Sequence, residues 1–187
     1  VPVKRSMDSK GFVNIMYGCD KFCTYCIVPY TRGRERSRRK EDILREVEEL
    51  KASGRKEVVL LGQNVNAYGK DLKMEDGFTQ LLVAVAKTGI ERISFYTSHP
   101  RDYSETTIDA MRDYPNIMPF LHLPVQSGSN EVLRRMARGY TVERYKQLYN
   151  DLKKKVPHIA FTTDLIVGFP NETDEEFEAT LDLVRYC

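Results

Sequence analysis

The chain has 187 residues, of which 41% are hydrophobic and 30% are charged, and this ordinary globular composition argues against intrinsic disorder. The longest strongly apolar runs, such as 58–61, are far shorter than the roughly 20 apolar residues that span a bilayer, so we expect no membrane partner. Lys and Arg number 29 against 27 Asp and Glu, a formal charge of +2, and this near balance does not by itself indicate a nucleic-acid binder.

Short β-type runs alternate with helical patterns along the chain. In the first helical pattern, Ile43, Leu44, Val47 and Leu50 form one apolar stripe, and Gly54 ends it. In chain order the sequence predicts a strand at 12–16, a helix at 41–53, a strand at 57–62, a helix at 78–87, a strand at 92–97, a helix at 104–112, a strand at 118–125, helices at 129–136 and 141–155, a strand at 159–167 and a helix at 173–186.

Five strand–helix units in sequence predict an α/β fold with a parallel sheet and right-handed crossovers. The pattern alone leaves two architectures open, an open doubly wound sheet and a barrel. In both, functional residues are expected at the C-terminal ends of the strands. The polar segments at those ends are 18–26, 62–66, 97–100, 124–129 and 168–172.

The cysteines give a more specific signal than the composition. Cys19, Cys23 and Cys26 lie within eight residues, and Cys187 is the last residue. Three neighbouring cysteines cannot pair off internally, so the spacing predicts a metal or cluster site in a reducing, cytoplasmic compartment. Three thiolates can hold three corners of an iron–sulfur cube and leave one iron open. The alternative is a structural zinc site, although no His lies near the loop to complete it.

Cys19-x3-Cys23-x2-Cys26, with the aromatic Tyr25 before the last cysteine, resembles the signature of the radical S-adenosylmethionine (radical SAM) enzymes. The longer segments 18–33, 61–69, 97–100 and 121–129 resemble the MiaB-type tRNA methylthiotransferases of that superfamily, and the resemblance covers essentially the whole chain. It implies a partial (β/α) TIM-like barrel of the radical SAM type. It also implies two cofactors, a [4Fe-4S] cluster on the three cysteines and S-adenosyl-L-methionine on the open iron.

The resemblance implies an enzyme that carries out radical methylthiolation at C2 of N6-isopentenyladenosine near the tRNA anticodon. The implied partners are that tRNA and an electron donor such as flavodoxin or ferredoxin, and we expect a monomer. Two alternatives stay within the enzyme class, a methylthiotransferase for threonylcarbamoyl-adenosine tRNA or one for a ribosomal protein. The alternative from another class is a zinc-stabilised RNA-binding module without chemistry.

The family also bears on the domain organisation. Its members carry an N-terminal methylthiotransferase domain with three further cysteines for a second cluster, and a C-terminal TRAM domain that binds RNA. This chain has one cysteine group, starts without Met and ends inside a predicted helix. We therefore expect residues 1–187 to form a radical SAM core truncated after about five βα units. Such a piece would bind the cofactors but would not insert sulfur alone.

Further site residues follow from the resemblance by motif position. Gln126 and Arg138 match a pair that contacts S-adenosylmethionine, and a guanidinium suits its carboxylate. Asp164 matches an acceptor for ribose hydroxyls, and Ile166 a residue beside the adenine. Without the resemblance, Arg138 could be a solvated helix-end cation, Gln126 a loop cap, Asp164 a buried strand-end cap and Ile166 ordinary core.

The loop that begins at Gly62 and ends at Gly69 places Gln63 and Asn64 at the expected mouth of the site, near cofactor or substrate. A simple turn is the plainer reading. In the family's Gly-Phe-Pro-Gly-Glu-Thr segment, this chain has Asn171 in place of the second glycine. Asn tolerates left-handed backbone next best after glycine, so we expect the turn to be kept.

A basic run contains Arg32, Arg34 and Arg36, followed by three more cations, and Glu35 is its one acidic residue. It predicts either RNA phosphate contacts next to the cysteine loop or a solvated surface. Aromatic side chains for stacking on a flipped base, or for the core, are Tyr30 and Tyr68. The sequence predicts no chemical role for the three histidines: we expect structural roles for His99 and His122 and a surface position for His158.

Overall fold

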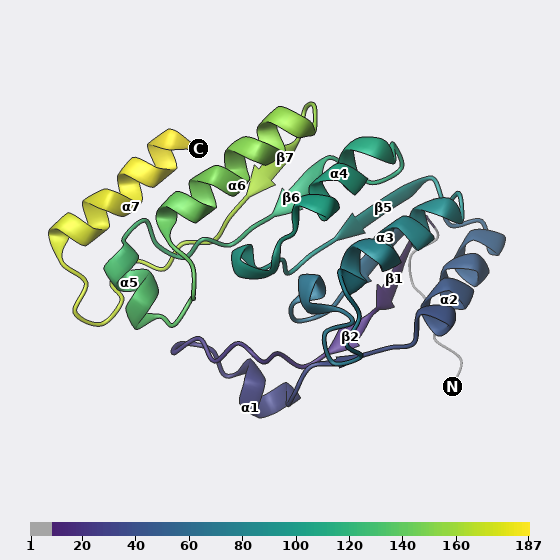
Figure 1. Ribbon diagram of the computed structural model, residues 1–187, viewed down its shortest axis with the longest axis horizontal. Coiled ribbons are helices and arrows are strands. Elements are labelled where there is room, and N and C mark those ends of the chain that lie inside the picture. Colours follow the sequence, from purple (N-terminus) through teal and green to yellow (C-terminus); the bar gives the residue numbers. More distant parts are fainter. Residues whose placement is uncertain (1–8) are drawn as a thin grey trace.

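Five parallel strands form the centre of the fold in the computed structural model, which describes residues 9–187. Three strands form one sheet in the order β1-β4-β5, and β6 pairs with β7 (Figure 1). An isolated parallel bridge between Ile93 and Ile117 joins β5 to the segment that leads into β6. The strands are β1 (Lys10–Asn14), β4 (Glu57–Leu61), β5 (Arg92–Phe95), β6 (Phe120–His122) and β7 (Ala160–Thr162). The predicted α/β class and parallel pairing are confirmed.

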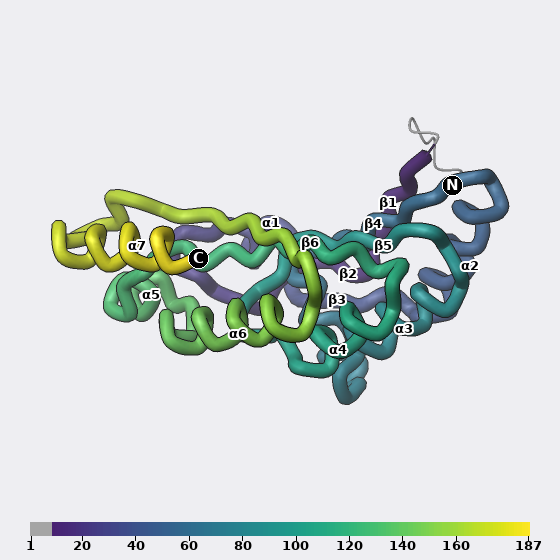
Figure 2. Tube along the Cα trace, turned by 90° about the horizontal axis from the view of Figure 1, so that it is seen from above, coloured from purple at the N-terminus to yellow at the C-terminus, as the bar shows by residue number. Residues whose placement is uncertain are grey.

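The helices that connect these strands lie largely on one side of them, as Figure 2 shows for α3, α4 and α6. The six predicted helices are present as α2 (Lys40–Ala52), α3 (Gly77–Lys87), α4 (Glu105–Asp113), α5 (Asn130–Arg135), α6 (Val142–Lys155) and α7 (Asp174–Tyr186). Ser104, Ser129, Thr141 and Thr173 cap four of them by accepting an amide hydrogen bond three residues on. At α7 the predicted capping box is complete, and Asn171 just before it has φ of 62°, so the left-handed turn is kept.

Two strands are shorter than predicted, and several short elements were not predicted. The strands expected at 118–125 and 159–167 each shorten to three residues. Pro119 and Pro124 flank the first of them and lack the amide hydrogen that a ladder needs. The missed elements are β2 (Met16–Tyr17), α1 (Val28–Arg32), β3 (Arg36–Ser37) and the 3-10 turns η1 (Val65–Ala67) and η2 (Pro100–Asp102).

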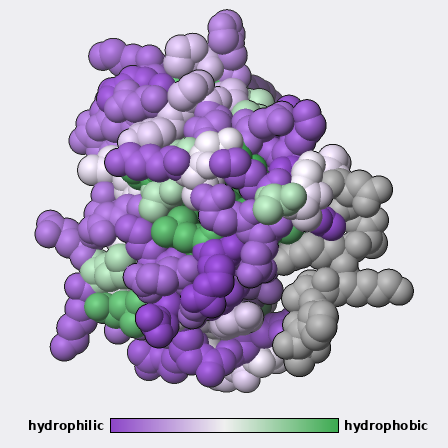
Figure 3. Space-filling view, turned by 90° about the vertical axis from the view of Figure 1, so that its right-hand side faces the viewer, coloured by the Kyte–Doolittle hydropathy of each residue, from purple (hydrophilic) through white to green (hydrophobic). Residues whose placement is uncertain are grey.

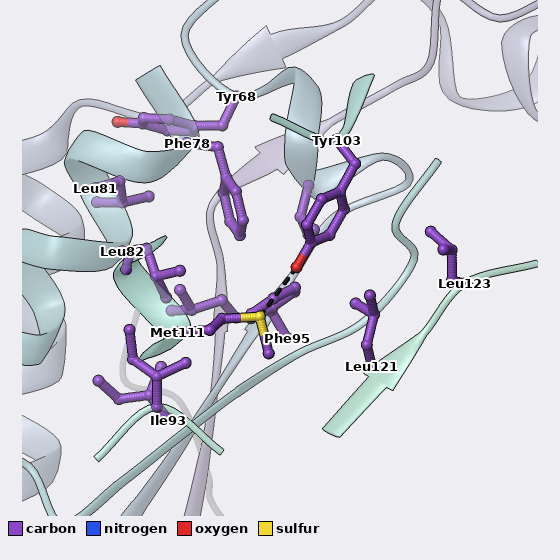
Figure 4. Packing of buried hydrophobic residues seen from close by; sticks show 14 of the residues in the cluster. Tyr68, Phe78, Leu81, Leu82, Ile93, Phe95, Tyr103, Met111, Leu121 and Leu123 are labelled. Atoms are coloured by element: carbon purple, nitrogen blue, oxygen red, sulfur yellow. Dashed lines mark hydrogen bonds between the residues drawn. The ribbon is translucent and has the colours of Figure 1, made fainter. Parts of the chain in front are cut away.

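The hydrophobic core lies between the strands and the helices that cover one side of them. Val58, Val59 and Leu60 of β4 are fully buried, as expected for a strand covered on both faces. Phe78 and Phe95 meet edge to face with ring centroids 5.2 Å apart (Figure 4). Tyr68 is also core, since it is 1% exposed and its hydroxyl donates to the Arg38 carbonyl at 2.8 Å. Its predicted alternative role as a stacking residue is therefore excluded.

The surface at the β1 and α2 end of the molecule is mostly hydrophilic, with small scattered hydrophobic areas (Figure 3). Among residues 9–187, no helix has both the length and the apolar character needed to cross a bilayer. His158 is exposed, as expected.

Candidate functional site

A cavity of about 200 Å³ opens at the C-terminal ends of the strands. Each of the five strands contributes to its wall through the segment that follows it, so the predicted convergence of these segments is confirmed, although the last strand contributes Asp164 rather than 168–172. The lining residues that the sequence analysis singled out for the site are Cys19, Cys23, Tyr25, Cys26, Gln63, Asn64, Gln126, Arg138 and Asp164.

The three clustered cysteines face this cavity as free thiols, whereas Cys187 is exposed at the end of α7. Cys23 is 7% exposed, and burial raises the pKa of the Cys19 thiol. No three His, Cys, Asp or Glu side chains among residues 9–187 converge as ligands of a single metal ion. A four-iron cluster instead binds each cysteine to a separate iron, so a set of thiols spread around a cavity wall fits that group.

The cysteine loop is anchored separately in each of its two intervals. Between Cys19 and Cys23, Asp20 exchanges hydrogen bonds of 3.2 Å with Glu35, and Lys21 pairs with the buried carboxylate of Asp102. Between Cys23 and Cys26, Thr24 donates its amide to the Met136 carbonyl at 3.1 Å and its hydroxyl to the Arg135 carbonyl at 3.0 Å, at the end of α5. The thiols are thus held in place by contacts from distant segments.

Arg138 is the most deeply placed cation of the site, with 6% of its surface exposed. Its guanidinium donates to the Pro124 carbonyl at 2.9 Å, to the Tyr140 and Tyr25 hydroxyls at 3.1 and 3.2 Å, and to the Cys23 sulfur at 3.5 Å. None of these partners is a carboxylate, and within residues 9–187 no acidic side chain forms an ion pair with Arg138. Arg138 is therefore no solvated helix-end cation, and its surroundings suit an anionic ligand or thiolates.

Gln126, Asp164 and Ile166 lie together where β6 and β7 continue past their ends. The Gln126 amide donates to the Asp164 carbonyl, and its carbonyl accepts from the Ile166 amide, both at 2.9 Å. The Asp164 carboxylate is 65% exposed and lies 3.4 Å from His122 Nε2, so the buried strand-end reading is wrong. Ile166 is half-buried beside the site but belongs neither to the cavity lining nor to the core cluster.

Tyr25, Gln63 and Asn64 also stand where they were expected. Burial is the main cause that raises the pKa of Tyr25, whose hydroxyl receives the Arg138 hydrogen bond. Gln63 Oε1 accepts from the Gly18 amide at 2.7 Å, which ties the loop after β4 to the cysteine loop. Asn64 is 2% exposed and donates to Asp102 at 2.7 Å. The loop is therefore more than a simple turn.

The cavity also contains residues to which the sequence analysis gave no role in the site. Lys21 lines it between two of the cysteines, and His99 lines it from the segment after β5. His99 Nδ1 accepts the Arg101 amide at 3.2 Å, and burial lowers the pKa of its ring to about 3, so the ring is neutral. The same wall holds Thr97, Ser98 and His122. Their signals in the sequence were the position after a strand and membership of segments 97–100 and 121–129, which carry the family resemblance; no periodicity tells which side chains turn inward.

The basic run lies outside the cavity. Arg32, Arg34 and Arg36 are exposed, and Arg34 pairs with Asp20 at 2.8 Å. Tyr30 of α1 is 75% exposed and meets Phe22, 53% exposed, edge to face with ring centroids 5.9 Å apart. Val28 at the start of α1 lines the cavity, so this basic and aromatic surface adjoins its mouth. Glu35, the single acid of the run, is buried.

Comparison with known proteins gives consistent results. The family model of the radical SAM superfamily matches residues 13–184. The chain is 57% identical over 186 residues to the tRNA-2-methylthio-N(6)-dimethylallyladenosine synthase of Carboxydothermus hydrogenoformans, covering 99% of the chain and 42% of that relative. It is 58% identical to the Bacillus subtilis protein of the same name, of which it covers 36%. The chain thus spans less than half the length of these relatives.

Solved structures with low sequence identity share the fold. The radical S-adenosylmethionine methyltransferase TsrM from Kitasatospora setae, with tryptophan and aza-SAM bound, matches with a TM-score of 0.76 at 19% identity, covering 96% of this chain and 34% of that one. The cobalamin-dependent S-adenosylmethionine radical enzyme OxsB matches with a TM-score of 0.74 at 15% identity, covering 92% and 26%. At these identities the likeness concerns the fold alone.

Proposed function

Since this chain belongs to the radical SAM superfamily, we propose that Cys19, Cys23 and Cys26 hold a [4Fe-4S] cluster and that the adjoining cavity binds S-adenosyl-L-methionine. When bound, this pair supplies a one-electron reductive cleavage that yields a carbon radical able to abstract hydrogen. The observation that carries the proposal is Arg138, a buried guanidinium that touches the Cys23 sulfur from the cavity wall and has no carboxylate partner among residues 9–187.

The protein side chains bind and orient in this proposal. Arg138 pairs with the carboxylate of S-adenosylmethionine, which supplies the anion that its surroundings lack. The exposed Asp164 carboxylate accepts hydrogen bonds from the sugar hydroxyls of the cofactor, Gln126 contacts the cofactor beside it, and Ile166 lies next to them. Tyr25 packs beside the cluster, and Gln63 and Asn64 close the cavity from the β4 side.

For the protein as a whole we propose radical methylthiolation at C2 of N6-isopentenyladenosine in tRNA. Relatives of that name align with 99% of the chain, which supports this reaction over the two related methylthiotransferases. We propose that Arg32, Arg34 and Arg36 contact RNA phosphates, because they are exposed next to the cavity mouth. A flavodoxin- or ferredoxin-type electron donor, a monomeric state and a cytoplasmic location complete the proposal.

Anaerobic iron–sulfur reconstitution of the chain tests the cofactor proposal. We expect about four irons per chain and an EPR spectrum that changes when S-adenosylmethionine is added. Cys23→Ala abolishes both, whereas Cys187→Ala, which removes a thiol outside the cavity, changes neither. Stoichiometric zinc in place of iron, or a spectrum indifferent to S-adenosylmethionine, would instead support the zinc-stabilised RNA-binding module.

A second assay tests the substrate. The full-length protein is given unmodified tRNA, isopentenylated tRNA and threonylcarbamoylated tRNA, and methylthio-nucleosides are measured by mass spectrometry. Product on the isopentenylated tRNA alone supports the proposal. Product on the threonylcarbamoylated tRNA, or on a ribosomal protein, would assign the chain to the corresponding alternative.

A further inference from the structure

A buried carboxylate, Asp102, lies behind the cavity wall in η2, just after β5. Its side chain is 4% exposed and accepts hydrogen bonds from three side chains. Lys21 Nζ lies 2.9 Å from it, Lys70 Nζ 2.5 Å and Asn64 Nδ2 2.7 Å. Burial would raise the pKa of this carboxyl, but the three donors outweigh burial and lower the pKa to about 2. Asp102 is therefore ionised at every working pH.

The three donors come from segments that Asp102 brings together. Lys21 lies in the cysteine loop, two residues after Cys19, and its amide also donates to the Cys19 sulfur at 3.4 Å. Asn64 and Lys70 both belong to the loop after β4. Lys21 and Asn64 line the cavity, whereas Asp102 does not. Asp102 therefore acts on the cavity only through its neighbours, which is the arrangement of a positioning residue.

The charges around the cysteines are balanced unequally. On the β5 side, the Lys21 ammonium, 14% exposed, is paired with Asp102. On the α5 side, the Arg138 guanidinium touches Cys23 without any carboxylate partner in the described part of the chain. Asp102 is shared by Lys21 and Lys70, so it cancels part of the positive charge on the β5 side, where the buried Glu35 carboxylate also acts on Cys19. The reduction potential of an iron–sulfur cluster depends on the net charge and hydrogen bonds around it, so this cancellation matters to a cluster held there.

We propose that Asp102 is a positioning residue that fixes Lys21 and with it the interval between Cys19 and Cys23, and that the Lys21–Asp102 pair sets the reduction potential of the cluster. This inference rests on the cluster assignment proposed above. A purely structural ion pair would not affect the midpoint potential of the cluster, whereas the Lys21–Asp102 pair proposed here does. The two partners carry opposite charges, so removing each of them must shift the potential in opposite directions.

The experiment is an EPR-monitored redox titration of the anaerobically reconstituted chain and its variants. Asp102→Asn removes a negative charge and stabilises the reduced cluster, so its midpoint potential rises. Lys21→Met removes a positive charge, so its midpoint potential falls, and the double variant lies between the two. Lys70→Met shifts the potential less than Lys21→Met, because Lys70 is 48% exposed and lies outside the cysteine loop. The control is Lys56→Met, an exposed lysine paired with Glu91.

Opposite shifts for Asp102→Asn and Lys21→Met support the proposal. Equal potentials in both variants, or shifts of the same sign, overturn it. If Asp102→Asn fails to hold iron, the sign of the Lys21→Met shift decides. Failure of the cofactor proposal is recognisable separately, because the wild-type chain would then lack iron or ignore S-adenosylmethionine before any variant is compared.

Discussion

Replacing Arg138 tests the cofactor site most directly. Arg138→Met keeps the length of the side chain but removes the guanidinium and its four hydrogen bonds, to Pro124, Tyr140, Tyr25 and Cys23. If a carboxylate of S-adenosylmethionine pairs with it, the variant leaves that charge in the cavity without a partner. Loss of one member of a buried charge pair typically weakens binding by about 2–5 kcal/mol. This corresponds to a roughly 30- to 4,000-fold higher Kd.

The assay is anaerobic titration of the reconstituted chain with S-adenosylmethionine, followed by EPR. Arg138→Lys keeps the charge but loses the planar fork, so we expect an intermediate Kd. Arg134→Met is the matched control, because Arg134 lies on the neighbouring turn, is 72% exposed and pairs with the exposed Glu131. A thermal melt of each variant separates loss of affinity from loss of fold. A Kd for Arg138→Met within threefold of wild type would refute the assignment of the carboxylate to this guanidinium.

Three further predictions concern other parts of the molecule. The pKa of the Asp102 carboxyl is lowered from the usual 3.8 to about 2, so its contribution to the free energy of unfolding is present above pH 4 and is lost as the pH falls toward 2. Denaturant titrations of the iron-free wild-type chain should show that the free energy of unfolding falls by about 1–2 kcal/mol from this source over that range. The Asp102→Asn variant should lack this contribution to the pH dependence. In Gly128→Ala the new methyl carbon would lie 2.4 Å from the Ala179 carbonyl oxygen of α7, and we expect about 1–3 kcal/mol of destabilisation by chemical denaturation; an unchanged midpoint would show that α7 does not pack there. For RNA, we expect Arg32→Ala to reduce the slope of log K against log salt concentration by about one unit for binding to an anticodon stem-loop. Tyr30→Ala should weaken binding without changing this slope. Arg185→Ala on α7 is the control, and equal slopes for the two arginine variants would show that the basic run does not contact RNA.

Features with local sequence signals were predicted well. The helices after Ser104, Ser129, Thr141 and Thr173 were found because a capping hydroxyl and an apolar stripe are both visible within a few residues. The strands of the first sheet were found because each is a short apolar run. The grouping of the cysteines with segments far along the chain followed from the rule that parallel strands end at one edge.

Features that depend on contacts between distant residues were not predictable. Lys21 and Asp102 are 81 residues apart, and neither lies in a pattern that marks it as buried. The family resemblance placed Arg138 at the cofactor site, but only the fold shows that Cys23, 115 residues earlier, contacts its guanidinium. The lengths of β6 and β7 were overestimated because an apolar run does not reveal where its ladder partner stops.

The cysteine loop crosses the joint between the two parts of the sheet. Its first interval is fastened to the segment after β5, through Lys21 and Asp102, and its second to the end of α5, through Thr24 and Met136. The two parts also meet edge to edge at the Ile93–Ile117 bridge. A rigid inorganic group bound to the three thiols would therefore cross-link the two parts of the sheet through the cysteine loop. Metal loading should slow amide hydrogen exchange in β6 and β7, although neither strand supplies a ligand.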